Sequence, residues 1–193
     1  VNYDISAAEK GGYEYFMMKE IQEQPRAVRT CIGSRMREDG EIVLDKIRLT
    51  EEQIKKIGRI YIVACGSAWH AGIVAKYVIE EIARIPVEVD LASEFRYRRP
   101  ILSQDDLCIA ISQSGETADT LAALREARAN DVYVLSIVNA VGSTIARESD
   151  DVLYTMAGPE IAVATTKGYS TQLAVIYLLA LKFAKVRHAM RPE

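Results

Sequence analysis

The sequence has 193 residues, of which 49% are hydrophobic and 26% charged, and its formal net charge is −3. This length and balance are typical of a soluble α/β protein that buries a sizeable core. The slight excess of acidic residues argues against nucleic acid or an anionic membrane surface as a partner, and no apolar run reaches the roughly 18–20 residues of a membrane span.

Residues 1–57 are polar and are predicted to form a helical lead-in segment ahead of the main domain. The stretch EYFMMKEIQEQPRAVRTCIG, residues 14–33, has an apolar stripe at helical spacing, and Pro25 is expected to kink or divide that helix. Thr50 and Gln53 then have the spacing of a capping box, which predicts a second, short helix.

Residues 58–193 are predicted to form one domain in which strands and helices alternate. The strand candidates are RIYIVAC, VEVDLA, LCIAIS, VYVLSIV and DVLYTM. The helix candidates are residues 69–83, 93–98, 119–129, 143–148 and 166–186. Four of the strands are nearly continuous apolar runs, as expected for strands that are covered on both faces. The pattern predicts a three-layer, doubly wound α/β fold around a five-stranded parallel sheet.

The stretch SQSGET, residues 112–117, lies between a buried strand candidate and a helix candidate and is rich in hydrogen-bonding groups. Its donors are the hydroxyls of Ser112, Ser114 and Thr117, the amide of Gln113 and the first N–H groups of the helix. Gly115 allows close approach of the backbone, and the helix dipole favours an anion. We therefore predict a phosphate-binding loop, although each hydroxyl taken alone also suits a cap or a turn. Glu116 does not fit an anion site, so its carboxylate is expected to point away or to bind elsewhere.

Two further loops follow strand candidates, and in a doubly wound sheet ligands bind at that edge. In CGSAWHAG, Gly66 permits a tight turn, and Ser67 either caps the helix or contacts a ligand. In EIAVATTKGYSTQ, Lys167 either pairs with an anion or is a solvated first-turn lysine.

Cys31, Cys65 and Cys108 are odd in number and contain no C-x-x-C pair. They are interpreted as reduced thiols of a cytoplasmic protein, with Cys65 and Cys108 in strands and Cys65 buried, rather than as disulfides or zinc ligands. With only two histidines in the chain, we expect no metal site. The sequence lacks an initiator Met and a signal peptide, which suggests an excised part of a longer chain.

Five motifs occur together in this order: ACGSAWHAG, VEVDLASEFRYR, ISQSGETADTLAALR, GSTIARESD and EIAVATTKGYSTQL. With this spacing they closely resemble the first sugar-isomerase (SIS) domain of the glutamine–fructose-6-phosphate aminotransferase family. The resemblance covers residues 10–188, and SQSGETADT with ASEFRYR is its most specific part. It implies the same five-stranded parallel sheet between helices.

The resemblance implies a role in making glucosamine 6-phosphate from fructose 6-phosphate and glutamine, without an organic cofactor or a metal. The residues that it implies for substrate binding are Gly66, Ser67, Ser112, Gln113, Ser114, Thr117, Val163, Ala164 and Thr165. Those of SQSGET would hold the phosphate, and those near residue 164 the hydroxyl end of the sugar. Ala68 stands where many members of the family have serine, so one hydroxyl contact is missing.

The resemblance also implies partners, namely a glutaminase domain and a second SIS domain in the full-length chain. Those segments would carry the catalytic residues, so we expect none in this chain and no turnover by it alone. The alternatives are a stand-alone SIS isomerase and the sugar-phosphate sensing domain of a regulator, which would bring a basic DNA-binding segment. The last helix is apolar almost all round between Leu173 and Leu181, which predicts a homo-oligomer with this helix or residues 1–30 at the interface.

Overall fold

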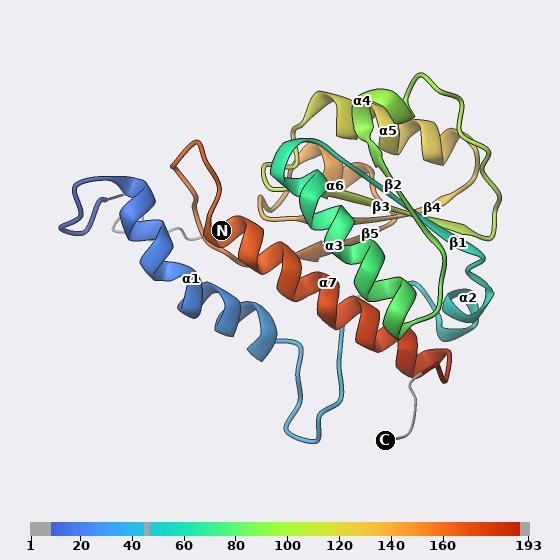
Figure 1. Cartoon of the computed structure of the whole chain (residues 1–193), viewed down its shortest axis with the longest axis horizontal. Helices are drawn as coiled ribbons and strands as arrows, with labels where there is room; N and C mark the ends of the chain where they lie inside the picture. The colour runs from blue at the N-terminus through green and yellow to red at the C-terminus, as the bar shows by residue number, and fades with distance from the viewer. Residues whose placement is uncertain (1–8, 45–46, 190–193) are drawn as a thin grey trace.

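The computed structural model describes residues 9–44 and 47–189, and Figure 1 shows the helices and strands in chain order. The helices are α1 (Phe16–Gly33), α2 (Glu51–Lys56), α3 (Gly66–Ile82), α4 (Ala92–Phe95), α5 (Ala118–Ala129), α6 (Thr144–Glu148) and α7 (Lys167–Val186). The strands are β1 (Arg59–Ala64), β2 (Val87–Leu91), β3 (Asp106–Ser112), β4 (Tyr133–Val138) and β5 (Asp151–Tyr154). Within these ranges, no helix is long and apolar enough to cross a membrane.

The five strands form one parallel sheet in the order β2-β1-β3-β4-β5. In β1, β3 and β4 every residue after the first is buried, as expected for strands covered on both faces. The predicted doubly wound α/β fold is therefore confirmed. The shorter strands β2 and β5 form the two edges.

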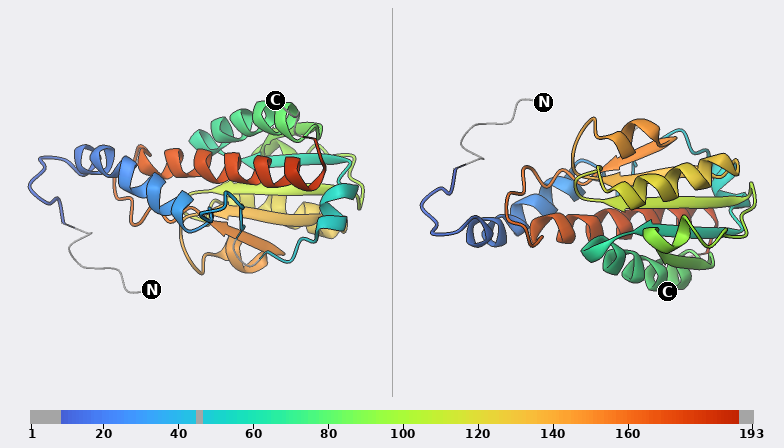
Figure 2. Two further views of the ribbon diagram at one scale, coloured as in Figure 1. Left: turned by 90° about the horizontal axis from the view of Figure 1, so that it is seen from below. Right: turned by 90° about the horizontal axis from the view of Figure 1, so that it is seen from above.

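Helices cover both faces of the sheet, as the two views of Figure 2 show. One core lies between the sheet and α3 and α7, and it also contains buried residues of α1 and α2. A second core lies on the opposite face and contains buried residues of α4, α5 and α6. As predicted from its apolar sequence, α7 is buried over most of its surface, because α1, α3 and the sheet surround it.

The lead-in segment is attached to the sheet through buried groups. The predicted capping box of α2 is present, with the side chains of Thr50 and Gln53 each accepting a hydrogen bond from the other residue's backbone N–H. The carboxylate of Asp151, at the start of β5, accepts hydrogen bonds from the N–H groups of Arg48 and Leu49 and from the Tyr133 hydroxyl. These contacts tie the segment before β1 to the far edge of the sheet.

Helix α1 is continuous, with Pro25 inside it, so Pro25 does not divide the helix. Buried side chains of residues 31–57 share the core beneath α7 with residues of the sheet. The division of the chain into segments 1–57 and 58–193 stays a prediction. The apolar side chains of α1 that face away from α7, including Met18 and Ile21, are exposed, and the predicted oligomer also stays a prediction.

Candidate functional site

The candidate site lies where the chain leaves β1 and β3, which are neighbours at the centre of the sheet. From β1 the chain passes through α3 to β2 on one side, and from β3 it passes through α5 to β4 on the other. The two connections therefore diverge, and α3 and α5 lie on opposite faces. Such a divergence opens a crevice at the carboxyl ends of the strands, which is where doubly wound proteins bind ligands.

A pocket of about 250 Å³ occupies this crevice. It is lined by Cys65, Gly66, Ser67, Ala68, Ile111, Ser112, Gln113, Ser114 and Thr117. Six of the nine substrate-binding residues implied by the family resemblance are thus brought together, from two loops that are about 45 residues apart in the sequence. Among the described residues that line this pocket, none is a lysine, an arginine or a carboxylate.

The loop of residues 112–117, which we call the phosphate loop, is held largely by its own side chains. The Oγ of Ser112 accepts the N–H of Gly115 at 3.0 Å and shares a hydrogen bond with Oγ1 of Thr117, also at 3.0 Å. The Oγ of Ser114 accepts the N–H of Glu116 at 3.2 Å. All three hydroxyls therefore shape the loop while their residues line the pocket, and Ser114 is the exposed one of the three.

Gly115 is required by both backbone geometry and space. Its φ is +67°, a region that side chains other than glycine rarely adopt. A Cβ at this position would lie 2.0 Å from Oγ of the buried Ser143. The carbonyl of Gly115 also accepts the N–H of Ile145, so α6 packs directly behind the phosphate loop.

The N-termini of α3 and α5 both begin at the pocket. The N-cap residues are Cys65 for α3 and Thr117 for α5, and neither side chain caps its helix. Ser67 lies inside the first turn of α3, so the expectation that it could be a helix cap is wrong. The first N–H groups of two helices and their positive dipole ends are thus directed to one crevice that carries no cationic side chain.

The two carboxylates nearest the phosphate loop have partners outside the pocket. Glu116 Oε1 accepts the backbone N–H of Thr144 at 2.8 Å, and this hydrogen bond lowers the pKa of Glu116. The expectation that Glu116 binds elsewhere is confirmed. Asp119, in the first turn of α5, forms an ion pair with Arg96 at 3.0 Å. The ion pair offsets the charge of Asp119, and the hydrogen bond directs the ionised carboxylate of Glu116 to α6.

The third predicted contact region lies outside the pocket. Val163 and Ala164 are exposed and Thr165 is half-buried, in a loop that runs from β5 to α7. None of the three lines the pocket around the phosphate loop. Their contact with the sugar stays a prediction.

Asn139, which directly follows β4, links this third loop to the phosphate loop. Its N–H donates to the carbonyl of Gln113, and its side chain holds Thr155, Ala157 and Gly158 at distances of 2.8–2.9 Å. The sequence analysis missed this residue. Its signal was a polar side chain at the carboxyl end of a buried strand, the same signal that identified Ser112.

The start of α7 is stabilised by carboxylates rather than by a hydroxyl cap. Glu160 accepts the N–H groups of Thr166 and Gly168 at 2.8 and 3.0 Å, and its second oxygen accepts the hydroxyl of Thr165 at 2.9 Å. Lys167 is 4% exposed and pairs with Glu23 of α1 at 2.6 Å. The expectation of a solvated Lys167 is therefore wrong, because α1 covers it, and the anion with which it pairs is the carboxylate of Glu23.

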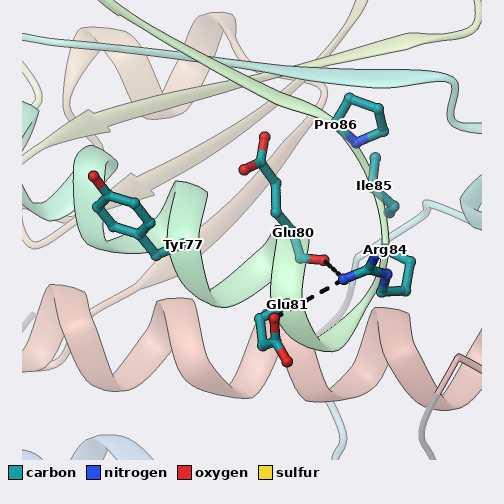
Figure 3. A pocket seen from close by; sticks show the side chains of 6 residues that line it. All are labelled: Tyr77, Glu80, Glu81, Arg84, Ile85 and Pro86. Atoms are coloured by element: carbon teal, nitrogen blue, oxygen red, sulfur yellow. Dashed lines mark hydrogen bonds and ion pairs between the residues drawn. The ribbon is translucent and has the colours of Figure 1, made fainter.

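A larger groove of about 460 Å³ lies at the other end of α3 (Figure 3). It is lined by Tyr77, Glu80, Glu81, Arg84, Ile85 and Pro86. Roughly 20 Å of helix separates it from Gly66. Its two carboxylates disfavour an anionic ligand, so size alone does not identify the site.

The structure also places the three cysteines. Cys31 and Cys108 are buried and Cys65 is half-buried. Cys65 follows β1 rather than lying in it, so its predicted burial in a strand is wrong. Cys108 lies in β3 as predicted, and its burial raises the pKa of the thiol to about 12. Across residues 9–44 and 47–189, no group of three or more His, Cys, Asp or Glu side chains is placed to hold a metal ion.

Comparison with known proteins agrees with this geometry. A model of the SIS domain matches residues 53–182. The chain is 60% identical over 190 residues to the glutamine–fructose-6-phosphate aminotransferase [isomerizing] of Caldanaerobacter subterraneus subsp. tengcongensis, a match that covers 98% of this chain and 31% of that protein. The predicted resemblance is confirmed, and the chain spans about a third of the length of the curated relatives it matches.

Solved structures share the fold. The C-terminal domain of glucosamine-fructose-6-phosphate aminotransferase from Francisella tularensis has a TM-score of 0.89 and 43% identity, covering 95% of this chain and 51% of that chain. Glucosamine-6-phosphate deaminase from Thermotoga maritima has a TM-score of 0.72 and 23% identity, covering 89% of this chain and 49% of that chain. The second likeness shows the fold alone.

Proposed function

Because this chain belongs to the SIS domain family, we propose that it is the sugar-phosphate-binding part of the isomerase half of a glutamine–fructose-6-phosphate aminotransferase. Its ligands are fructose 6-phosphate and glucosamine 6-phosphate, and its role is in the cytoplasmic synthesis of amino sugars. The glutaminase and second SIS domains of that enzyme are its proposed partners.

One observation carries the proposal: the phosphate loop and the N-termini of α3 and α5 converge on the same pocket. A phosphate dianion needs several donors in a small space, and hydroxyls with oriented N–H groups supply them without a cationic side chain. The carboxylates of Glu116 and Asp119 have partners elsewhere, so repulsion of the ligand is reduced.

The same pocket favours a binding role over complete catalysis. Aldose–ketose isomerisation requires a positioned acid and base, and the pocket is lined mainly by groups that do not titrate near neutral pH. A stand-alone isomerase is therefore less well supported than a part that receives its acid and base from other segments. A sensing domain is also less well supported, because residues 31–57 contribute to the core instead of forming a separate basic unit.

The test is the affinity for fructose 6-phosphate after substitution of Ser114. We expect Ser114→Ala to weaken binding by about 1–2 kcal/mol, or about five- to thirtyfold in Kd, the scale of one hydrogen bond to a charged group. The control is Ser103→Ala. Ser103 is also exposed, and its Oγ accepts the N–H of Asp105, two residues along the chain. It lies before β3, however, at the amino-terminal end of the strand, away from the pocket. Equal affinities of the two variants in titration calorimetry would contradict the assignment.

A further inference from the structure

The loop of residues 158–166, which we call the arm, is held by its own Glu160 near α7 and by side chains that reach its other parts from elsewhere. It crosses from the edge strand β5 to the start of α7, and its residue Val163 is fully exposed. In the described chain, no backbone–backbone hydrogen bond involves residues 159–165. The position of the arm therefore depends on side-chain contacts.

One end of the arm is fixed to the phosphate loop. Asn139 donates from its side chain to the carbonyl of Gly158 at 2.8 Å, and its own N–H donates to the carbonyl of Gln113 at 3.1 Å. A single residue thus sets the distance between the start of the arm and the phosphate loop.

The middle of the arm is fixed by α1. Glu20 Oε1 accepts the N–H of Ile161 at 2.6 Å and the N–H of Ala162 at 3.1 Å, and Glu20 is only 2% exposed. Figure 1 shows α1 and the arm side by side at this point. In the described part of the chain, the second oxygen of Glu20 has no hydrogen-bond partner. A buried carboxylate without hydrogen bonds is costly, and displacing the arm would remove the two that Oε1 accepts.

Further contacts of α1 hold the root of the arm. Glu23 pairs with Lys167 at 2.6 Å, and Gln24 accepts the hydroxyl of Ser170 at 2.6 Å. Together with Glu20 they lie on one face of α1, at the three- and four-residue spacing of a helix. This face holds both the arm and the first turn of α7.

From these contacts we propose that Glu20 is a positioning residue for sugar-phosphate binding, through which α1 holds the arm beside the pocket. The proposal rests on the proposed function and deepens it, because it assigns the lead-in helix a role in binding. The phosphate loop does not use α1, so Glu20 affects the sugar end of the ligand and not its phosphate.

The test compares two ligands, fructose 6-phosphate and inorganic phosphate, by NMR titration of the 193-residue chain. We expect Glu20→Ala to weaken fructose 6-phosphate about three- to tenfold, because the arm must then be ordered on binding, and to leave inorganic phosphate unchanged. Glu20→Gln retains an acceptor oxygen and is expected to bind like the wild type. Amide exchange of Ile161 and Ala162 should accelerate in Glu20→Ala only.

Several outcomes would overturn the proposal. One is an unchanged affinity of Glu20→Ala for fructose 6-phosphate despite faster exchange of the two amides. Another is an equal weakening of both ligands, which would indicate a general structural defect. If Glu20→Ala does not fold, Glu20→Asp takes its place in the same two titrations. Aspartate keeps the charge, but its shorter side chain moves the acceptor oxygen away from the N–H groups of Ile161 and Ala162. If the wild type binds no fructose 6-phosphate, the proposed function fails first; if Ser114→Ala alone loses affinity, only the role of Glu20 fails.

Discussion

The phosphate loop and the arm both follow the carboxyl ends of strands, but they are stabilised in different ways. The hydroxyls of Ser112 and Ser114 accept N–H groups within the phosphate loop, no more than three residues away. The arm has one local contact of this kind, at Glu160, but its middle depends on Glu20, which is about 140 residues distant in the sequence. A loop that carries its own hydrogen-bond partners is specified locally, whereas a loop held by another helix is specified only by the complete fold.

The largest effect is expected from Gly115→Ala, which tests whether the phosphate loop tolerates any change of shape. The new Cβ would lie 2.0 Å from Ser143 Oγ and 2.5 Å from Ser143 Cβ, and the φ of +67° would be strained. We expect a loss of about 2–4 kcal/mol in the free energy of unfolding, measured in urea, and no detectable binding of fructose 6-phosphate.

The control for that variant is Gly142→Ala. Gly142 also has a positive φ, +74°, but no atom lies within 4 Å of its added Cβ. We expect Gly142→Ala to lower the free energy of unfolding by only about 1 kcal/mol, the cost of the backbone strain. Equal destabilisation of both variants would show that contact with Ser143 does not shape the phosphate loop.

A smaller effect is expected at the arm, from Gly168→Ala. Alanine is ordinarily the better helix residue by about 1 kcal/mol. At this position, however, the Cβ would lie 2.5 Å from Glu160 Oε2 and 2.9 Å from Thr165 Oγ1, the contacts that join the arm to α7. We expect destabilisation by about 1–2 kcal/mol in urea unfolding. Stabilisation instead would mean that Glu160 moves aside freely and that the arm is not anchored there.

The smallest effect concerns the pH dependence of the contact between the phosphate loop and α6. The hydrogen bond from Thr144 lowers the pKa of Glu116 below its ordinary value of 4.5, so ionised Glu116 stabilises the fold above that value. This contribution is lost as the pH falls through the folded pKa. We expect the wild type to exceed Glu116→Gln in urea midpoint at neutral pH and the difference to shrink as the pH is lowered through the folded pKa. A difference that grows at low pH would contradict this sign.

The sequence predicted those parts of the molecule whose cause is local. The apolar runs predicted the buried strands, and the grouping of Ser112, Ser114 and Thr117 after one of them predicted the loop that lines the pocket. The paired roles of Thr50 and Gln53 were equally predictable, because both groups lie within one turn.

The remaining features depend on tertiary contacts that no local pattern encodes. Lys167 has the sequence context of an exposed lysine, and only the packing of α1 on α7 buries it against Glu23. Ser67 suited a helix cap, but α3 begins at Gly66, so its N-cap is Cys65, two residues before Ser67. Glu20 could not be identified at all, because its partners are backbone N–H groups, which have no signature in the sequence.

The most direct test of the central claim is a crystal structure of the chain soaked in fructose 6-phosphate. We expect the phosphate to lie in the pocket at the carboxyl ends of β1 and β3, within hydrogen-bonding distance of the phosphate loop. A phosphate bound more than one helix away, for example in the groove beside Tyr77 and Arg84, would contradict the assignment.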